Sequence, residues 1–174
     1  MNASSILSNV APKIFGSFII GNFAVIVQEL IYKKTLFSTN YFNLKEDQVV
    51  KAVDFVKADL CSQMVNEFPE LQGIMGGYFA NEQGFEKEIS LAISEQYLPI
   101  GLNSKIPKKP YSIALSLADK IDTLVGFFGI NQKPTSSKDP FALRRLALGI
   151  IKIIIENKKD FKIRDLISYS SSLY

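Results

Sequence analysis

The chain has 174 residues, of which 47% are hydrophobic and 21% are charged, and its formal net charge is +3. This length and composition are typical of one folded domain with a sizeable core, and they exclude a disordered chain. Because the sequence has no histidine and a single cysteine, Cys61, it excludes Ser-His-Asp and Cys-His catalysis, nearly all catalytic zinc sites and any disulfide within the chain.

Residues 1–43 give the weakest pattern. No basic residue precedes Lys13, so the charged opening of a signal peptide is missing. The uncharged run 14–28 is shorter than the roughly 20 residues that a membrane span needs, which favours a buried helix over a membrane-associated or partner-facing segment. If the run faces a partner, residues 14–27 are a candidate seam for a homo-oligomer. Residues 32–43 are interpreted as a connection.

A helix is predicted over residues 44–67. Asn43 followed by Glu46 is typical of a capped helix start. Apolar residues then recur at helical spacing and predict a buried stripe, formed by Val49, Val53, Val56, Leu60 and Met64. Lys57 and Asp59 lie off this stripe, either as a solvated pair or pointing toward a neighbouring helix.

Pro69 is expected to end this helix and to begin another over residues 69–80. Gly73 and Gly77 are four residues apart on one helical face, which lets a second helix approach closely. A phosphate-binding loop is excluded here, because no lysine followed by serine or threonine comes after the glycines. The glycines therefore predict close helix packing.

The next expected helix covers residues 85–97, and a proline-rich loop follows it to residue 110. The predicted buried side of this helix consists of Ile89, Ala92, Ile93 and Tyr97. The loop carries Lys105, Lys108 and Lys109. These lysines suit contact with phosphate groups, although solvated lysines give the same pattern.

Two helices joined by a polar loop are predicted from residue 114 to residue 155. In the first helix, Gly129 is a candidate for the left-handed residue that closes it, and the apolar stripe consists of Leu117, Ile121, Leu124 and Phe128. Asp139 followed by Pro140 is typical of an N-cap and a first helical position, so the second helix is expected to begin there. This second helix is apolar on more than one side, so most of it is expected to be buried. A short helix over 163–169 and a frayed end complete the chain.

These periodicities, without an alternating strand pattern, predict an all-α, single-domain helical bundle. Charge is unevenly spread over it. Residues 1–100 hold seven lysines against eleven acidic residues, a net charge of −4, whereas residues 101–174 hold thirteen basic residues against six acidic ones, a net charge of +7. This asymmetry is compatible with a surface that binds nucleic acid, and equally with solvated lysines.

The charged residues between 114 and 155 have two interpretations. If the two helices pack antiparallel, Asp119 and Asp122 are within reach of Arg144 or Arg145 and form structural ion pairs with them. Alternatively, one arginine faces nucleic acid together with Lys152, since positions 145 and 152 share a helical face. The two interpretations are compatible, because adjacent arginines on a helix point about 100° apart.

Two blocks of the sequence resemble a known family. The block LADKIDTLVGFFGINQKPTSSKDPFALRRLALGIIKIIIE, at residues 117–156, closely resembles a segment of the beta subunit of bacterial heterotetrameric glycyl-tRNA synthetase. The block KADLCSQMVNEFPELQGIMGGYFA, at residues 57–80, is similar to an earlier block of that family, in the same order along the chain. The resemblance covers residues 52–156. It implies a helical region related to HD-type phosphohydrolases, hence an HD-domain-like fold over 44–174 and a divergent N-terminal segment, 1–43, packed on it.

The resemblance implies a fragment or shortened form of the glycine-tRNA ligase beta subunit, which supports aminoacylation of tRNA-Gly through structure and tRNA contacts. Activation of glycine with ATP and Mg²⁺ is expected in the alpha subunit, so this chain alone is expected to hold no complete active site, catalytic residue, cofactor or metal. The implied partners are the alpha subunit and tRNA-Gly in the cytoplasm, and not a membrane. The candidate tRNA-binding residues are Lys133, Lys138, Arg144, Arg145, Lys152, Lys108 and Lys109.

Two other functions compete with this one. A helical protein-interaction module would keep the fold without a role in translation, with residues 14–27 as its seam. A metal-dependent phosphohydrolase conflicts with the lack of histidine: where the family is expected to read EHYLP, this chain has Gln96, which cannot titrate. Oxygen ligands are the remaining route to a divalent metal, and the candidates are Asp119, Asp122, Glu67 and Glu70.

Overall fold

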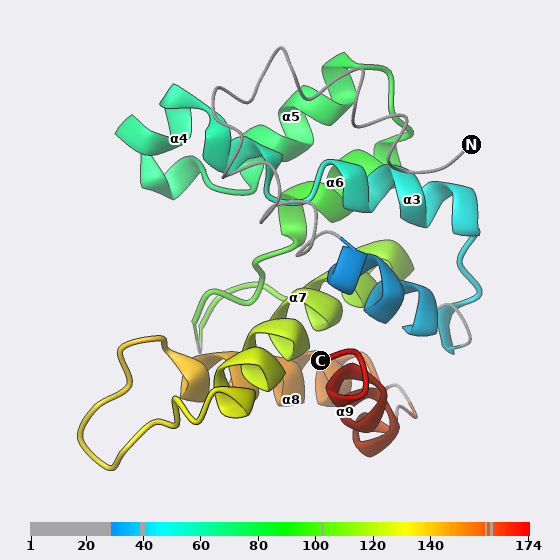
Figure 1. The fold of residues 1–174 in the computed structure, drawn as a ribbon. Helices are drawn as coiled ribbons and strands as arrows, with labels where there is room; N and C mark the ends of the chain where they lie inside the picture. Colours follow the sequence, from blue (N-terminus) through cyan, green and yellow to red (C-terminus); the bar gives the residue numbers. More distant parts are fainter. Residues whose placement is uncertain (1–28, 39–40, 102, 159, 161) are drawn as a thin grey trace.

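The computed structural model describes residues 29–38, 41–101, 103–158, 160 and 162–174. Every regular element in these ranges is helical (Figure 1). The predicted all-α, single-domain bundle is therefore confirmed, whereas its HD-domain-like character and the division after residue 43 stay predictions. The buried helix predicted over 14–28 and the seam predicted over 14–27 lie outside the described residues. In the ranges given above, no helix has both the length and the apolar character needed to cross a membrane.

The bundle is built around α7 (Pro110–Gly129), with α3 to α6 on one side and α8 and α9 on the other (Figure 1). Residues 29–38 are helical, and the remaining elements are α3 (Glu46–Asp54), η2 (Ala58–Cys61), α4 (Gln63–Glu67), η3 (Pro69–Leu71), α5 (Ile74–Glu82), α6 (Lys87–Glu95), α8 (Leu143–Glu156) and α9 (Ile163–Ser171). One hydrophobic cluster joins α7, through Leu115 and Ala118, to α3, α5 and α6. The other joins α7, through Leu117 and Ile121, to α8 and α9. The central position of α7 follows from these two apolar faces.

The helix predicted over 44–67 is interrupted. Helix α3 ends at Asp54, and Lys57 then adopts a left-handed conformation, with φ of 60°, that turns the chain into η2 and α4. The valines of the predicted stripe are buried, but its last two residues, Leu60 and Met64, are 41% and 46% exposed. They leave the stripe because the turn breaks the helical period.

Lys57 and Asp59 do not form a solvated pair. Asp59 is fully buried, and its carboxylate accepts a hydrogen bond from the N–H of Gly73, the residue before α5. The Nζ atom of Lys57 lies 2.7 Å from Oδ1 of Asp119 on α7. The alternative in which these residues point toward neighbouring helices is therefore the one observed.

The start of the described chain also differs from the prediction. Residues 32–43 were expected to form a connection, but the chain is helical up to residue 38, with the side chain of Lys34 buried. Asn43 does not cap α3, because the residue before α3 is Lys45 and no side chain makes a capping hydrogen bond there. Asn43 instead has φ of 51° in the turn before the helix.

The close packing predicted from Gly73 and Gly77 is confirmed at the contact of α5 with α6. A Cβ atom added to Gly77 would lie 2.5 Å from Cβ of Ser94 on α6, closer than real Cβ atoms approach. Helix α5 begins at Ile74, later than predicted, because residues 69–71 form the separate 3-10 helix η3.

The helices after residue 85 lie close to their predicted positions. Helix α6 is shorter than predicted, and it buries Ile89, Ala92 and Ile93 as expected. Helix α7 begins at Pro110, before the predicted start at residue 114, and the left-handed residue that follows it is Asn131 rather than Gly129. Helix α8 begins at Leu143 instead of at Pro140.

Candidate nucleic-acid interface

Asp122 of α7 is held by two groups that are far apart in the sequence. Lys34, which is 0% exposed, donates a hydrogen bond to Oδ1 of Asp122, and the Tyr174 hydroxyl donates to the same atom at 2.7 Å. The Nζ atom of Lys34 also lies 4.8 Å from the centre of the Tyr174 ring, within the range of a cation–π contact. Burial and the bond to Asp122 raise the pKa of Tyr174, so its hydroxyl remains a donor at neutral pH. The predicted frayed end is thus wrong in part: α9 continues to Ser171 and the Tyr174 hydroxyl is bonded to Asp122 of α7, although Tyr174 is 64% exposed.

Asp119 lies about one turn before Asp122 and pairs with Lys57. The predicted partners of these structural ion pairs, Arg144 and Arg145, are therefore wrong, and lysines from outside α8 take their place. The reason is that the two arginines lie on exposed parts of α8. The Arg144 guanidinium donates to the backbone oxygen of Thr135, in the loop before α8.

Lys120, between the two aspartates, is buried and faces the turn that follows α6. Its Nζ atom donates to the backbone oxygen of Leu98 at 2.7 Å and to the Ser116 hydroxyl at 3.0 Å. Burial lowers the pKa of Lys120 to about 8, although the charge of nearby Asp119 acts in the opposite direction. Lys120 therefore ties the segment before Pro99 to α7 and is a structural group.

Asp139 sets the start of α8. Its Oδ1 atom accepts a hydrogen bond from the Leu143 N–H at 2.8 Å, and its Oδ2 atom accepts one from the Arg144 N–H at 3.0 Å. The side chain therefore binds N–H groups of the first turn, but the predicted N-cap is wrong in position: the residue before α8 is Ala142, with a φ of 54°, and Pro140 lies outside the helix. Both oxygens of the carboxylate are engaged in this way.

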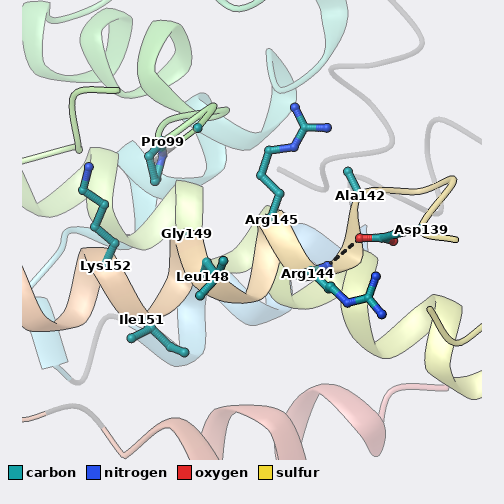
Figure 2. A pocket seen from close by; sticks show the side chains of 10 residues that line it. Pro99, Asp139, Ala142, Arg144, Arg145, Leu148, Gly149, Ile151 and Lys152 are labelled. Atoms are coloured by element: carbon teal, nitrogen blue, oxygen red, sulfur yellow. Dashed lines mark hydrogen bonds between the residues drawn. The ribbon is translucent and has the colours of Figure 1, made fainter. Parts of the chain in front are cut away.

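A pocket of about 580 Å³ lies beside α8. Its lining comes from the segment after α6, from the turn before α8 and from α8 itself, namely Pro99, Gly101, Asp139, Ala142, Arg144, Arg145, Leu148, Gly149, Ile151 and Lys152. Figure 2 shows Arg145 and Lys152 projecting to the side of α8 on which Pro99 lies, whereas Arg144 points away from them. In the described part of the chain, the Arg145 guanidinium has no hydrogen-bond or ion-pair partner. The pocket therefore combines an apolar wall with a cation that is available to a ligand.

The other candidate basic residues lie in two loops and are exposed; they are Lys133, Lys138, Lys108 and Lys109. The loop before α7 is fixed on α8 by two hydrogen bonds. Lys152 Nζ donates to the backbone oxygen of Ser104 at 3.0 Å, and Asn157 Nδ2 donates to that of Pro107 at 3.0 Å. Because a helix rises about 1.5 Å per residue, positions 145 and 157 are about 18 Å apart. The cations of α8 and the loop that it holds therefore lie along an extended edge. Three of the candidates, Arg144, Arg145 and Lys152, line one pocket, and Arg144 points away from the other two.

The apolar part of this pocket was not predicted from the sequence. Most of α8 was expected to be buried, but Leu148 and Ile151 are 50% and 48% exposed, and Ile155 is exposed as well. The spacing of these residues could have indicated that they are exposed. Positions 148, 151 and 155 share a helical face with position 144, and Arg144 on that face indicates contact with solvent.

The oxygen ligands considered for a divalent metal do not converge. Asp119 and Asp122 are paired with lysines, and Glu67 and Glu70 are exposed on α4 and η3. Among the residues that the structure describes, no group of three or more His, Cys, Asp or Glu side chains could hold a metal ion. The residues present here do not fit a metal centre.

Comparison with known proteins identifies a family. Residues 22–174 match the model of the family described as glycyl-tRNA synthetase beta subunit. The chain is 54% identical over 111 residues to the glycine-tRNA ligase beta subunit of Dinoroseobacter shibae, which covers 64% of this chain and 15% of that protein. The same subunit of Acinetobacter baumannii is 51% identical over 124 residues (71% and 18%), and that of Rickettsia canadensis is 47% identical over 135 residues (78% and 20%). The chain thus spans 15 to 20% of the length of these curated relatives.

Proposed function

We propose, because this chain belongs to the glycyl-tRNA synthetase beta subunit family, that it supports aminoacylation of tRNA-Gly through its helical structure and through contacts with tRNA, without chemistry of its own. The observation that carries the tRNA contact is the pair of Arg145 and Lys152 on one side of α8, beside a pocket. Seven residues of helix separate their Cα atoms by about 10 Å. Two cations at this separation suit phosphates of one RNA backbone, which position an RNA without reading its sequence.

In this proposal the alpha subunit activates glycine with ATP and Mg²⁺, and the partners of the chain are that subunit and tRNA-Gly, in the cytoplasm. The HD-domain-like arrangement of the helices belongs to the same proposal. Capture of a glycyl-tRNA synthetase alpha subunit by the immobilised chain, with and without tRNA-Gly, tests the partnership. Failure of capture in both cases would remove the alpha subunit from the proposal.

The tRNA contact is tested by the salt dependence of binding. Affinity of the chain for a tRNA-Gly transcript should fall as salt rises, because each cation that meets a phosphate displaces a counterion. Arg145→Gln and Lys152→Gln should each reduce the slope of the logarithm of the binding constant against the logarithm of the salt concentration by about one, which corresponds to one lost phosphate contact. Lys87→Gln is the matched control, since Lys87 is exposed on α6 in the acidic half of the chain. Equal effects of the three variants, or no binding at low salt, would withdraw the tRNA contact and leave the family membership unaffected.

A helical protein-interaction module is the second candidate function, and the exposed apolar side chains of α8 favour it. Leu148, Ile151 and Ile155 form an aliphatic face of the kind that binds another protein. This function predicts that Leu148→Ser weakens self-association or capture of the alpha subunit while no RNA binds. Analytical ultracentrifugation measures self-association, and the capture experiment measures binding of the alpha subunit. A chain that is monomeric at all concentrations and captures no alpha subunit would rule this function out.

A further inference from the structure

The pocket beside α8 has features that a phosphate-binding surface alone does not need. Backbone phosphates bind to exposed cations on any convex surface, whereas this site is hollow and has a volume of about 580 Å³. That volume lies in the range of pockets that enclose small ligands, roughly 300 to 1,000 Å³. The volume of the pocket therefore permits a small ligand.

The walls of the pocket are apolar and closely packed. Leu148 and Ile151 provide half-exposed aliphatic surface, and Pro99 lies against the same helix. Gly149 permits this approach, because a Cβ atom at that position would already lie 3.4 Å from Cγ of Pro99 and 3.3 Å from Cε of Lys120. Flat, apolar groups such as nucleobases bind between side chains of this kind.

The charges of the pocket favour an anionic ligand over an apolar side chain of another protein. Arg145 and Lys152 lie on one side of it. Among the described lining residues the carboxylate is that of Asp139, which accepts hydrogen bonds from two backbone N–H groups through both oxygens. Lys152 also lies 3.7 Å from Oε1 of Glu156 and donates to the backbone oxygen of Ser104, so Arg145 is the cation that these contacts leave available. The planar guanidinium of Arg145 can bind a phosphate or stack on a base. A group that carries both a base and a phosphate satisfies the apolar wall and the cations together.

We propose that this pocket holds one unpaired nucleotide of an RNA strand, with the base against Leu148 and Pro99 and the phosphate at Arg145 and Lys152. This inference rests on the proposed function, because it presumes that the chain binds RNA. A base inside a duplex is stacked and paired, and its faces are not available to such a wall. The pocket thus distinguishes RNA with single-stranded ends or loops from continuous duplex.

Three RNA probes test the inference on the whole chain at low salt: a short blunt duplex, the same duplex with a few unpaired nucleotides at one 3′ end, and the unpaired strand alone. The wild-type chain should bind the duplex with the unpaired end more tightly than the blunt one. Leu148→Ser should remove this preference, about a tenfold loss for the apolar contact of one leucine side chain, and leave the blunt duplex unaffected. Arg145→Gln should weaken binding of all three probes. Ile167→Ser, a comparable aliphatic-to-serine change at an exposed position of α9, is the control and should leave the affinity for all three probes unchanged.

Ultraviolet cross-linking of the unpaired nucleotides, followed by mass spectrometry, gives a readout that needs no variant. The cross-link should map to α8 or to residues 99–101.

Equal affinity for blunt and unpaired probes, a cross-link elsewhere, or equal effects of the two serine variants would overturn the inference while the RNA contact stands. Displacement of the unpaired probe by an equal concentration of a free nucleoside monophosphate would also overturn it, by assigning the pocket to a free nucleotide. Capture of the alpha subunit that depends on Leu148 while RNA binding does not would assign the pocket to a protein. Absence of binding to every probe would instead remove the proposed RNA contact itself.

Discussion

Removal of either partner of the buried pair of Lys34 and Asp122 should destabilise the fold strongly. Lys34 is 0% exposed and Asp122 is 8% exposed, so Lys34→Met would leave a carboxylate inside the bundle with the Tyr174 hydroxyl as its remaining side-chain donor. Removing one partner of a buried ion pair costs about 3–5 kcal/mol. The total stability of a domain is about 5–15 kcal/mol, so the loss is a large fraction of it. For a chain of this size we expect a fall in Tm of about 6–20 °C.

Urea unfolding of four proteins measures this contribution: the wild type, Lys34→Met, Asp122→Leu and the double variant. The double variant should be more stable than either single variant, because an apolar pair in the same space removes the uncompensated charge. The coupling energy from this cycle should exceed about 1 kcal/mol, as is typical for residues in direct contact. Arg144→Gln and Arg145→Gln are the comparison, and each should change stability by less than about 1 kcal/mol, since both side chains are exposed.

The opposite pattern would refute this reasoning. If Lys34→Met cost less than about 1 kcal/mol while Arg144→Gln or Arg145→Gln cost several, Asp122 would be paired with an arginine of α8, as the sequence alone suggested. A coupling energy near zero would show that Lys34 and Asp122 do not interact.

Three further predictions concern the packing of α5, the buried lysine of α7 and the start of α8. Gly77→Ala should destabilise the protein by about 1–3 kcal/mol, because the new Cβ atom would overlap Ser94, whereas Gly129→Ala, with no neighbour within 4 Å, should be neutral or slightly stabilising in the same urea assay. The pKa of Lys120 is about 8 in the folded protein, below its ordinary value of 10.5, so the unfolded chain binds more protons above pH 8 and the free energy of unfolding should rise with pH. We expect Lys120 to contribute a rise of about 1 kcal/mol between pH 8 and 9, measured as the difference between the wild type and Lys120→Met, since the raised pKa of Cys61 acts in the opposite direction in both proteins. Asp139→Ala should cost about 0.5–2 kcal/mol, measured by thermal unfolding, because two N–H groups of the first turn of α8 lose their acceptor.

Helical periodicity predicted the elements whose partners lie on one apolar face. The buried side of α6 and the core positions Leu117 and Ile121 of α7 follow directly from spacings of three and four residues, whereas Phe128, the last residue of the predicted stripe, is 47% exposed. The break after α3 could not be found in this way. The apolar period continues through Leu60 and Met64, and the turn at Lys57 is stabilised by a tertiary contact, the ion pair with Asp119. Local spacing contains no information about that contact.

The same limit applies to buried charge. Lys34 looks like a residue of an exposed connection, because lysine is almost never fully buried unless it is paired. Its partner, Asp122, is 88 positions away in the sequence. The aspartates of α7 were correctly expected to form structural ion pairs, but the arginines nearest to them across the hairpin were the wrong partners. A sequence shows which charges need a partner and does not show which of several cations comes close.

The pocket beside α8 could not be predicted from the sequence, because its walls come from segments that are far apart in the chain. Arg145 and Lys152 were identified from their shared helical face, and Figure 2 shows them on one side of α8. The other wall of the pocket is formed by Pro99, about fifty positions earlier in the chain, which can approach α8 because Gly149 has no side chain. A hollow between segments that are distant in sequence becomes visible only when the helices are packed.

The two blocks that carry the family resemblance are interlocked, and this determines how the RNA contact can be tested. Lys57, from the first block, neutralises Asp119, a residue of α7 in the second block. A shorter chain without residues 57–80 would leave the carboxylate of Asp119 buried without its cation, at a cost of several kcal/mol. The same deletion removes Gly73 and Gly77, on which α6 packs. Loss of RNA binding in such a fragment would therefore report unfolding of the bundle, whereas substitutions at Arg145, on an exposed face of α8, report the contact itself.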